Sequence, residues 1–265
     1  MNKLSQKIHG LKILFKFDNT AQLLINRLFF PNNGPNMYLL NGLEVLVDHS
    51  AGDQDGTRSC LVPGLYDPCF EALGDLPRSL SILDLGGNGG GFLLALKHTG
   101  REIRRAVVVE LNPHTHSRLT LNLLRNIPSC HKHITILNGA AGGAVGSLTV
   151  NLGRGSVGDS VTGSSQDGEE FTIPCHSFQT LAGYFPVEEE IDICKIDIEG
   201  AEYSLLQNTP PELLRRCRHI IIEIHEIPGE SVTALLEFIA AAGFARVHPP
   251  RPLLENTVYL FSRRQ

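Results

Sequence analysis

Two stretches of the sequence place charged side chains where buried strands are expected to end. Lys195, Asp197 and Glu199 lie in the run KIDIEGAE, and Glu223 and His225 lie in the run IIIEIH. Because side chains alternate along a strand, each set lies on one face of its strand. A buried ion without a partner costs several kcal/mol, so these groups are expected to pair or to meet a ligand at the sheet edge. We regard all five as candidate catalytic residues.

His225 and Asp197 are the two candidates for taking a proton from a substrate, because an imidazole titrates near neutral pH and a carboxylate can share that role. Lys195 and Glu199 are expected to orient the site. One alternative is an ion pair of Lys195 with a neighbouring carboxylate that only stabilises the loop. Another is a divalent metal, Mg²⁺ or Mn²⁺, held by His225 and the carboxylates of Asp197, Glu199 and Glu223. Their spacing is not diagnostic of a metal, so no metal ligand is assigned.

A glycine-rich turn stands earlier in the chain, in the run SILDLGGNGGGF at residues 81–92. The pattern predicts a buried strand, a tight turn and the start of a helix. Such a turn lets a ligand approach the backbone closely. Dinucleotide-binding domains use G-x-G-x-x-G, but here the third glycine position falls on Phe92, which argues against NAD. An acid near the strand end, Asp84, instead suits a cationic ligand such as S-adenosylmethionine, although an ordinary strand–helix turn remains an alternative.

Further candidate cofactor contacts follow the next two strands. Glu110 ends an apolar strand expected at residues 106–110, where an acid can accept hydrogen bonds from the two ribose hydroxyls of an adenosyl group. The loop after a strand expected at residues 134–137 would lie beside the adenine. The candidate cofactor-binding residues are therefore Asp84, Gly86, Gly87, Asn88, Gly89, Glu110, Leu111, Asn138, Gly139 and Ala140.

Alternating strands and helices are expected to position these side chains. From residue 81 onward, the order of strand, helix and strand indicates an α/β fold with a parallel sheet and right-handed crossovers. A last helix is expected at residues 231–242, and a closing antiparallel pair at residues 244–247 and 257–261. We assign residues 66–265 to this domain.

Two regions depart from that alternation. Residues 1–65 are expected to form an N-terminal cap, with helices up to Phe30, a β-hairpin around Asn41 and Gly42, and a loop beyond it. The segment from Leu11 to Phe30 can form an amphipathic pair of surface helices, which we expect to pack on the domain rather than to contact a membrane. Residues 139–170 are rich in Gly and Ser and predict a partly mobile lid or, almost equally, a disordered connection.

Composition and charge limit the partners and the location that we expect for this protein. The chain of 265 residues carries a net charge of −5 and has no basic stripe, so nucleic acid is not expected as a partner. Its six cysteines form no C-x-x-C pair, which favours reduced thiols and a cytoplasmic location. No apolar run is long enough for stable membrane insertion. A small-molecule acceptor is the expected partner. The oligomeric state stays open, with a homodimer as one alternative.

The motifs together resemble the FkbM family of S-adenosylmethionine-dependent methyltransferases. The family motifs D-x-G-A-N-x-G, E-P-N-P and K-x-D-x-E-G-A-E are similar to residues 84–90, 110–113 and 195–202, and the family's fifth-strand acid and histidine to Glu223 and His225. Gly87 stands where the family usually has Ala, and Leu111 replaces the first Pro of E-P-N-P. The resemblance covers about residues 66–242.

The resemblance implies a seven-stranded Rossmann-like methyltransferase domain with helices on both faces of the sheet. Members usually act on hydroxyls of sugars, glycolipids or polyketides, so we expect an O-methyltransferase of natural product biosynthesis that uses S-adenosylmethionine. An N-methyltransferase on the same fold is one alternative. A non-catalytic adenosyl- or nucleotide-binding regulatory module is another. The sequence does not identify the acceptor.

Overall fold

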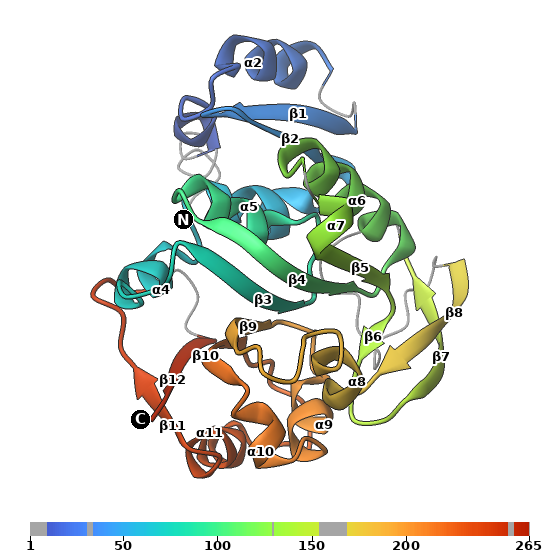
Figure 1. Cartoon of the computed structure of the whole chain (residues 1–265). Helices are drawn as coiled ribbons and strands as arrows, with labels where there is room; N and C mark the ends of the chain where they lie inside the picture. Colours follow the sequence, from blue (N-terminus) through green and yellow to red (C-terminus); the bar gives the residue numbers. More distant parts are fainter. Residues whose placement is uncertain (1–9, 31–33, 129, 154–168, 254–256, 265) are drawn as a thin grey trace.

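The computed structural model describes residues 10–30, 34–128, 130–153, 169–253 and 257–264, and a seven-stranded sheet lies at its centre (Figure 1). The strands are β3 (Ser79–Leu85), β4 (Glu102–Glu110), β5 (Ile134–Asn138), β9 (Ile191–Ile196), β10 (Cys217–Glu223), β11 (Phe244–Val247) and β12 (Val258–Arg263). Their order is β11-β12-β10-β9-β3-β4-β5. Only β12 runs antiparallel to its neighbours β10 and β11. The Rossmann-like sheet and its closing antiparallel pair are confirmed.

Helices cover both faces of this sheet (Figure 1). One face carries α5 (Gly91–His98), α6 (Pro113–Asn126) and α7 (Cys130–His133), and the other carries α8 (Phe178–Ala182), α9 (Glu202–Gln207), α10 (Pro211–Leu214) and α11 (Val232–Ala241). The strand alternation divides the apolar core accordingly: Ile82 packs in one cluster of buried residues and its neighbour Leu83 in the other.

The chain reverses its direction of winding between β3 and β9. The first three parallel strands extend the sheet to one side, from β3 to β4 to β5, and the later strands β9 and β10 extend it to the other. The register pairs Asp84 of β3 directly with Lys195 of β9. Ligands of open α/β sheets bind at such a switch point, beyond the carboxyl ends of the strands.

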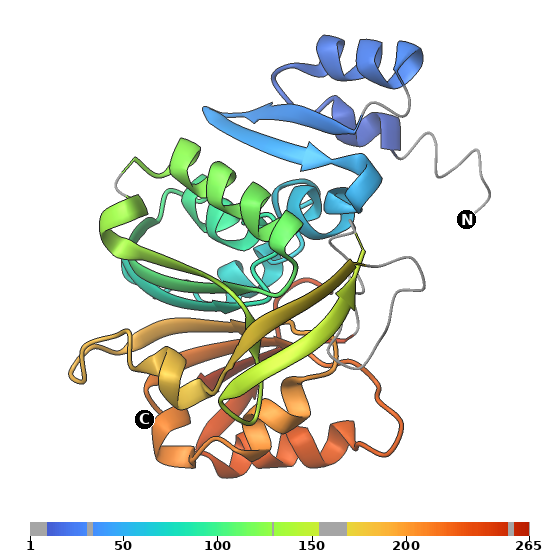
Figure 2. The same cartoon turned by 90° about the vertical axis from the view of Figure 1, so that its right-hand side faces the viewer.

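The N-terminal part forms a separate layer over α6 (Figure 2). It comprises α2 (Thr20–Phe29) and a hairpin of β1 (Pro35–Leu40) and β2 (Leu43–Asp48). Asn41 and Gly42 have φ angles of 47° and 83°, as a type I′ turn requires, so the expected hairpin is confirmed. Two asparagines of α6 pair with the free edge of β2. Asn122 bonds the backbone of Leu46, and Asn126 bonds that of Glu44.

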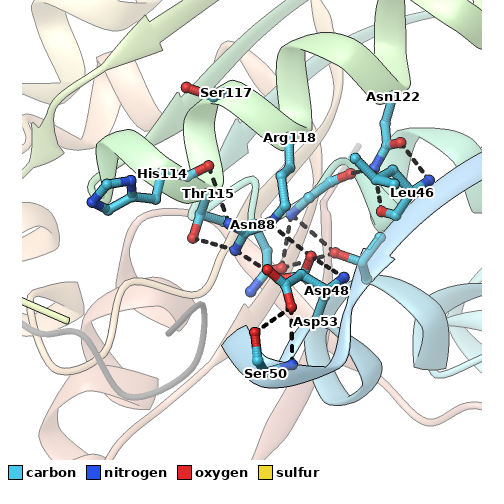
Figure 3. Close-up of polar contacts among 12 residues, drawn as sticks. Leu46, Asp48, Ser50, Asp53, Asn88, His114, Thr115, Ser117, Arg118 and Asn122 are labelled. Carbon is cyan, nitrogen blue, oxygen red and sulfur yellow. Dashed lines mark hydrogen bonds and ion pairs between the residues drawn. The ribbon is translucent and has the colours of Figure 1, made fainter. Parts of the chain in front are cut away.

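The loop expected after the hairpin is partly helical, which corrects the sequence prediction. It contains a 3-10 turn η1 (His49–Ala51), a π-helical turn η2 (Gln54–Arg58), α3 (Ser59–Leu61) and α4 (Asp67–Ala72). Tertiary contacts hold it. The buried carboxylate of Asp53 accepts two hydrogen bonds from Arg118 of α6, at 2.8 and 2.9 Å, and one from the backbone N–H of Asp48 (Figure 3). Local sequence patterns do not report such contacts.

The Gly- and Ser-rich region contributes a small three-stranded sheet. Its strands are β6 (Ala140–Ala141), β7 (Gly146–Leu152) and β8 (Glu169–His176), in the order β6-β8-β7. Residues 154–168 of the expected lid lie outside the described residues. Within the described part of the chain, no helix combines the length and the apolar character that crossing a membrane requires.

Candidate active site

A cavity of about 360 Å³ lies at the carboxyl ends of the central strands. Twelve of the fifteen candidate residues line it: Gly86, Gly87, Asn88, Glu110, Leu111, Gly139, Ala140, Lys195, Asp197, Glu199, Glu223 and His225. The three that do not are Asp84, Gly89 and Asn138. The fold therefore brings the glycine turn and both charged stretches to one place.

The glycine turn after β3 needs glycine for a steric reason. Gly86 has a φ of 80°, and a Cβ atom there would lie 1.7 Å from the backbone oxygen of Asp197. At Gly87, a Cβ would lie 2.3 Å from the side chain of Val108. The turn thus passes directly against β4 and the end of β9. At Gly86 an added Cβ would collide with backbone, whereas at Gly87 it would have to displace a side-chain methyl of Val108.

Residues of the N-terminal part support the same turn from outside. The hydroxyl of Thr57, in η2, donates to the side chain of Asn88 at 2.9 Å and accepts from the backbone N–H of Gly89 at 3.0 Å. Gly56 approaches so closely that an added Cβ would lie 2.4 Å from the Asn88 amide. Gly89 therefore packs against η2 instead of lining the cavity.

Glu110 is held in the cavity wall at the end of β4. Its two carboxylate oxygens accept hydrogen bonds from the backbone N–H groups of Asn88, at 2.8 Å, and Asn112, at 2.9 Å. The side-chain amide of Asn138 donates to the backbone oxygens of Glu110 and Leu111, at 2.9 and 3.0 Å. Asn138 thus fixes the loop, while its neighbours along the chain line the cavity. A carboxylate offers about four acceptor sites, so Glu110 can also accept from hydroxyl groups.

Lys195 joins the glycine turn to the acids of the site. Its ammonium lies 3.2 Å from Asp197 and 3.5 Å from Asp84, and it donates to the backbone oxygen of Gly86. Burial lowers the pKa of Lys195, but the two aspartates outweigh burial and raise it, so the ammonium stays charged. Burial raises the pKa of Asp84, and Lys195 opposes that rise. Asp84 is fully buried behind the cavity, so it acts through Lys195.

His225 lies just after β10, between two glutamates. Its Nδ1 is 3.0 Å from the carboxylate of Glu202, and its Nε2 is 3.4 Å from that of Glu199. Glu202 is fully buried and also accepts the backbone N–H of Ile198 at 3.1 Å. The hydrogen bond to Glu202 raises the pKa of His225 to about 9, with burial opposing the rise. Glu223 lies nearby and accepts from the hydroxyl of Thr257.

Glu199 has an unusual backbone conformation. Its φ is 51°, in the left-handed region of backbone conformation that residues other than Gly and Asn seldom adopt. Gly200 follows with a φ of 101°. Conformations of this kind cost about 1–3 kcal/mol and cluster at functional sites. The turn therefore holds the Glu199 carboxylate at the cavity against a local conformational preference.

A divalent cation remains compatible with part of this cluster. Ligand atoms of Asp197, Glu199 and His225 all lie within 4.8 Å of one another, but Glu223 does not belong to this group. The Lys195 ammonium already neutralises Asp197 at 3.2 Å. This competing charge weighs against a metal.

Several residues in or behind the cavity wall escaped the sequence prediction. Glu202 lies in the third quoted motif but was not among the candidate residues. Tyr66 and Phe92 form an apolar wall, with their rings perpendicular and their centroids 5.0 Å apart. Asp55 and Cys60, from the loop after the hairpin, also line the cavity. Glu202 is the last acid of that motif, so its place in the motif could have added it to the candidate residues.

Comparison with known protein families agrees with the motifs described above. The model of the methyltransferase FkbM domain matches residues 89–245, more than half of the chain. The chain belongs to the FkbM methyltransferase family. It therefore contains the domain of an S-adenosylmethionine-dependent methyltransferase, and the family, fold class and cofactor expected from the motifs are confirmed.

Solved structures with a similar fold share little sequence with this chain. An FkbM methyltransferase from Methylobacillus flagellatus KT is 17% identical, with a TM-score of 0.47 over 72% of this chain and 45% of that one. The chain thus spans less than half the length of that protein. Fibrillarin from Aeropyrum pernix, solved with natively bound S-adenosyl-L-methionine, is 13% identical, with a TM-score of 0.42 over 87% and 83% of the two chains. No curated protein matches the chain.

The cavity fits the cofactor that the family uses. The turn at Gly86 offers backbone without side chains, and the carboxylate of Glu110 in the cavity wall can accept hydrogen bonds from ribose hydroxyls. Nearby carboxylates suit a positively charged sulfonium.

Proposed function

We propose that this methyltransferase transfers a methyl group to a hydroxyl of a small molecule, in the class of sugars, glycolipids or polyketide natural products. The observation that carries this proposal is the imidazole of His225, which lines the cavity with one nitrogen bonded to a buried carboxylate. An alcohol must lose a proton when it accepts a methyl group, and a histidine held in this way can receive it.

S-adenosylmethionine supplies an electrophilic methyl group on a sulfonium. Gly86, Asn88 and Glu110 would hold it, together with the loop of Gly139 and Ala140. This chain's residues then have three tasks: to align the acceptor oxygen, to take its proton and to exclude water. Tyr66 and Phe92 form the apolar wall that serves the last task.

His225 is the better of the two candidate bases. Glu202 accepts from Nδ1–H, as in the histidine–carboxylate pairs of hydrolytic triads. Nε2, which lies 3.4 Å from the carboxylate of Glu199, is the nitrogen that takes the acceptor proton. Asp197 is less suited, because its carboxylate is engaged in an ion pair with the Lys195 ammonium at 3.2 Å. Since Glu202 raises the pKa of His225, the basic form becomes more abundant as the pH rises toward about 9.

The charge of the cavity mouth supports a neutral, hydroxyl-rich acceptor. Asp197, Glu199 and Glu223 all line it, and carboxylates accept hydrogen bonds from hydroxyls while they repel anions. An amine acceptor is the alternative that the same charges allow.

The experiment is a transfer assay with labelled S-adenosylmethionine and a panel of sugars, polyketides and amines. We expect label on a hydroxylated acceptor, and a loss of about 10²–10⁴-fold in kcat for His225→Asn with unchanged cofactor affinity. Full turnover in that variant would remove His225 from the role. Transfer only to amines would identify an N-methyltransferase. Cofactor binding without transfer to any acceptor would favour the regulatory module.

A divalent metal is the second candidate, because Asp197, Glu199 and His225 bring their ligand atoms together. A bound metal would lower the pKa of the acceptor hydroxyl. Calorimetric titration with Mg²⁺ and Mn²⁺ tests this, with Glu199→Gln as the variant that removes one ligand. Activity that is unchanged in excess chelator would contradict it.

The remaining assignments concern the whole chain. We propose a cytoplasmic protein, because Cys69, Cys175, Cys194 and Cys217 are all free thiols. We also propose that the cap of residues 1–65 helps to select the acceptor, since Asp55, Gly56 and Cys60 line the cavity. The lid at residues 139–170 stays a prediction.

A further inference from the structure

Helix α2 of the N-terminal part exposes an apolar face. Ile25, Leu28 and Phe29 are 52%, 73% and 72% exposed, and their spacing of three and four residues places them on one side of α2. Leu23, almost opposite, is the one buried residue of this helix. The helix thus has apolar side chains on both sides, and only one side packs on the protein. This departs from the expectation that the segment simply packs on the domain.

The exposed apolar surface extends beyond α2. Phe30 follows the helix and is 55% exposed, and Phe15 in the preceding segment is 67% exposed. Gly10 lies against the side chain of Arg27, so the preceding segment runs beside the last turn of α2. We call Leu11, Phe15, Ile25, Leu28, Phe29 and Phe30 the N-terminal apolar patch.

Basic residues accompany this patch on an otherwise acidic protein. The first thirty residues contain five basic residues and one acid, whereas the whole chain has a net charge of −5. Lys12, Lys16 and Arg27 are exposed beside the patch. The single acid, Asp18, accepts a hydrogen bond from the backbone N–H of Asn41. The patch therefore combines large apolar side chains with positive charge.

We propose that the N-terminal apolar patch docks on the surface of an anionic phospholipid bilayer. Interfacial helices insert apolar residues between headgroups while lysine and arginine meet the anionic lipids. A second copy of the chain fits less well, because a two-fold contact would bring the same cluster of positive charges together. α2 has ten residues, so it lies at the membrane surface rather than across the bilayer.

Docking in this way leaves the active site accessible. α2 is the outermost layer of the molecule, beyond the hairpin and α6 (Figures 1 and 2). No described residue before Asp55 lines the cavity. Membrane binding and cofactor binding can therefore be measured independently.

The test is cosedimentation of the full chain with phosphatidylcholine vesicles that contain phosphatidylglycerol. We expect binding that weakens at least tenfold in the double variant Leu28→Asp, Phe29→Asp. The matched control is Val187→Asp, because Val187 is 89% exposed on another part of the protein and its replacement should leave binding unchanged. Lys12→Gln with Lys16→Gln should weaken binding and reduce its salt dependence.

Circular dichroism and S-adenosylhomocysteine affinity establish that each variant is folded. Native protein that stays in the supernatant with these vesicles would overturn the proposal. A dimer in light scattering that Leu28→Asp dissociates, without vesicle binding, would also overturn it and assign the patch to a second copy. An acceptor screen that fails would bear on the proposed function but not on this surface.

Discussion

At the scale of single residues, the site depends on one buried cation. Lys195 lies within 3.5 Å of both Asp84 and Asp197, and neither carboxylate oxygen of Asp84 has a hydrogen-bond partner among the described residues. Lys195→Met would leave the fully buried Asp84 without its counter-charge. We expect a loss of about 3–5 kcal/mol in the free energy of unfolding, measured by urea denaturation.

The double variant Lys195→Met, Asp84→Asn is the control for that measurement, because it removes both charges. It should recover part of the lost stability. If the double variant is as unstable as the sum of both single variants, the two charges do not interact as described.

Substitutions at Gly86 and Gly42 distinguish the cost of a steric collision from the cost of backbone strain. Gly86 and Gly42 have φ angles of 80° and 83°, but an added Cβ meets Asp197 at 1.7 Å in the first case and nothing within 4 Å in the second. Gly42→Ala should cost about 1–2 kcal/mol of stability from strain alone. Gly86→Ala should cost clearly more and also abolish S-adenosylhomocysteine binding in calorimetry. Equal effects of the two substitutions would contradict the collision.

Much of the site was predictable at this scale, and the reason is geometric. The motifs lie at strand ends, and parallel strands bring their carboxyl ends to one edge, so Glu110, Lys195 and His225 were expected together. Glu202 was missed because its role depends on a helix start folding back under His225. Asn138 and Gly89 were expected to contact the cofactor, but their polar groups are used by the backbone and by Thr57.

At the scale of elements, α6 connects the N-terminal hairpin to the glycine turn. Asn122 and Asn126 lie one turn apart and pair with Leu46 and Glu44 of β2 (Figure 3 shows the first pair). Asn122 also donates to the backbone oxygen of Gly89 at 2.8 Å. The helix therefore supplies hydrogen-bond partners to the free edge of β2 and also supports the glycine turn after β3.

The two asparagines make a matched pair of variants. Each substitution by alanine should cost about 1–3 kcal/mol in the free energy of unfolding, because buried backbone groups of β2 lose their partners. Only Asn122→Ala should also weaken S-adenosylhomocysteine binding in calorimetry, through Gly89. Equal cofactor affinity in both variants would show that α6 does not support the turn.

The strands of the central sheet were expected from continuous apolar runs, whereas the segment of residues 49–61 was not recognised as helical. Its turns η1, η2 and α3 are too short for a hydrophobic period to appear. They are held instead by distant side chains, such as Arg118 on Asp53 (Figure 3). The strands that carry the candidate cofactor contacts were therefore predicted better from sequence than the segment of residues 49–61.

At the scale of the whole molecule, His225 links stability to pH. The pKa of a histidine in the unfolded chain is about 6.5, and in the folded protein that of His225 is raised to about 9. Its contribution to stability is therefore fully present below about pH 6.5 and is lost as the pH rises through about 9.

We expect this histidine to account for a fall on the order of 2 kcal/mol in the free energy of unfolding between about pH 6 and pH 10. Urea denaturation at a series of pH values measures it, and His225→Gln should show a smaller fall. Identical curves for the two proteins would contradict the link.

The most direct test of the proposed active site is an NMR titration of the His225 imidazole, which needs no acceptor. We predict an apparent pKa of about 9 in the native protein and a lower value in Glu202→Gln, because the variant lacks the buried charge that stabilises the imidazolium. His219, whose pKa is lowered by burial, is the internal control and should not change. A His225 that titrates at or below about 6.5 in the native protein, or one that Glu202→Gln leaves unchanged, would contradict the account.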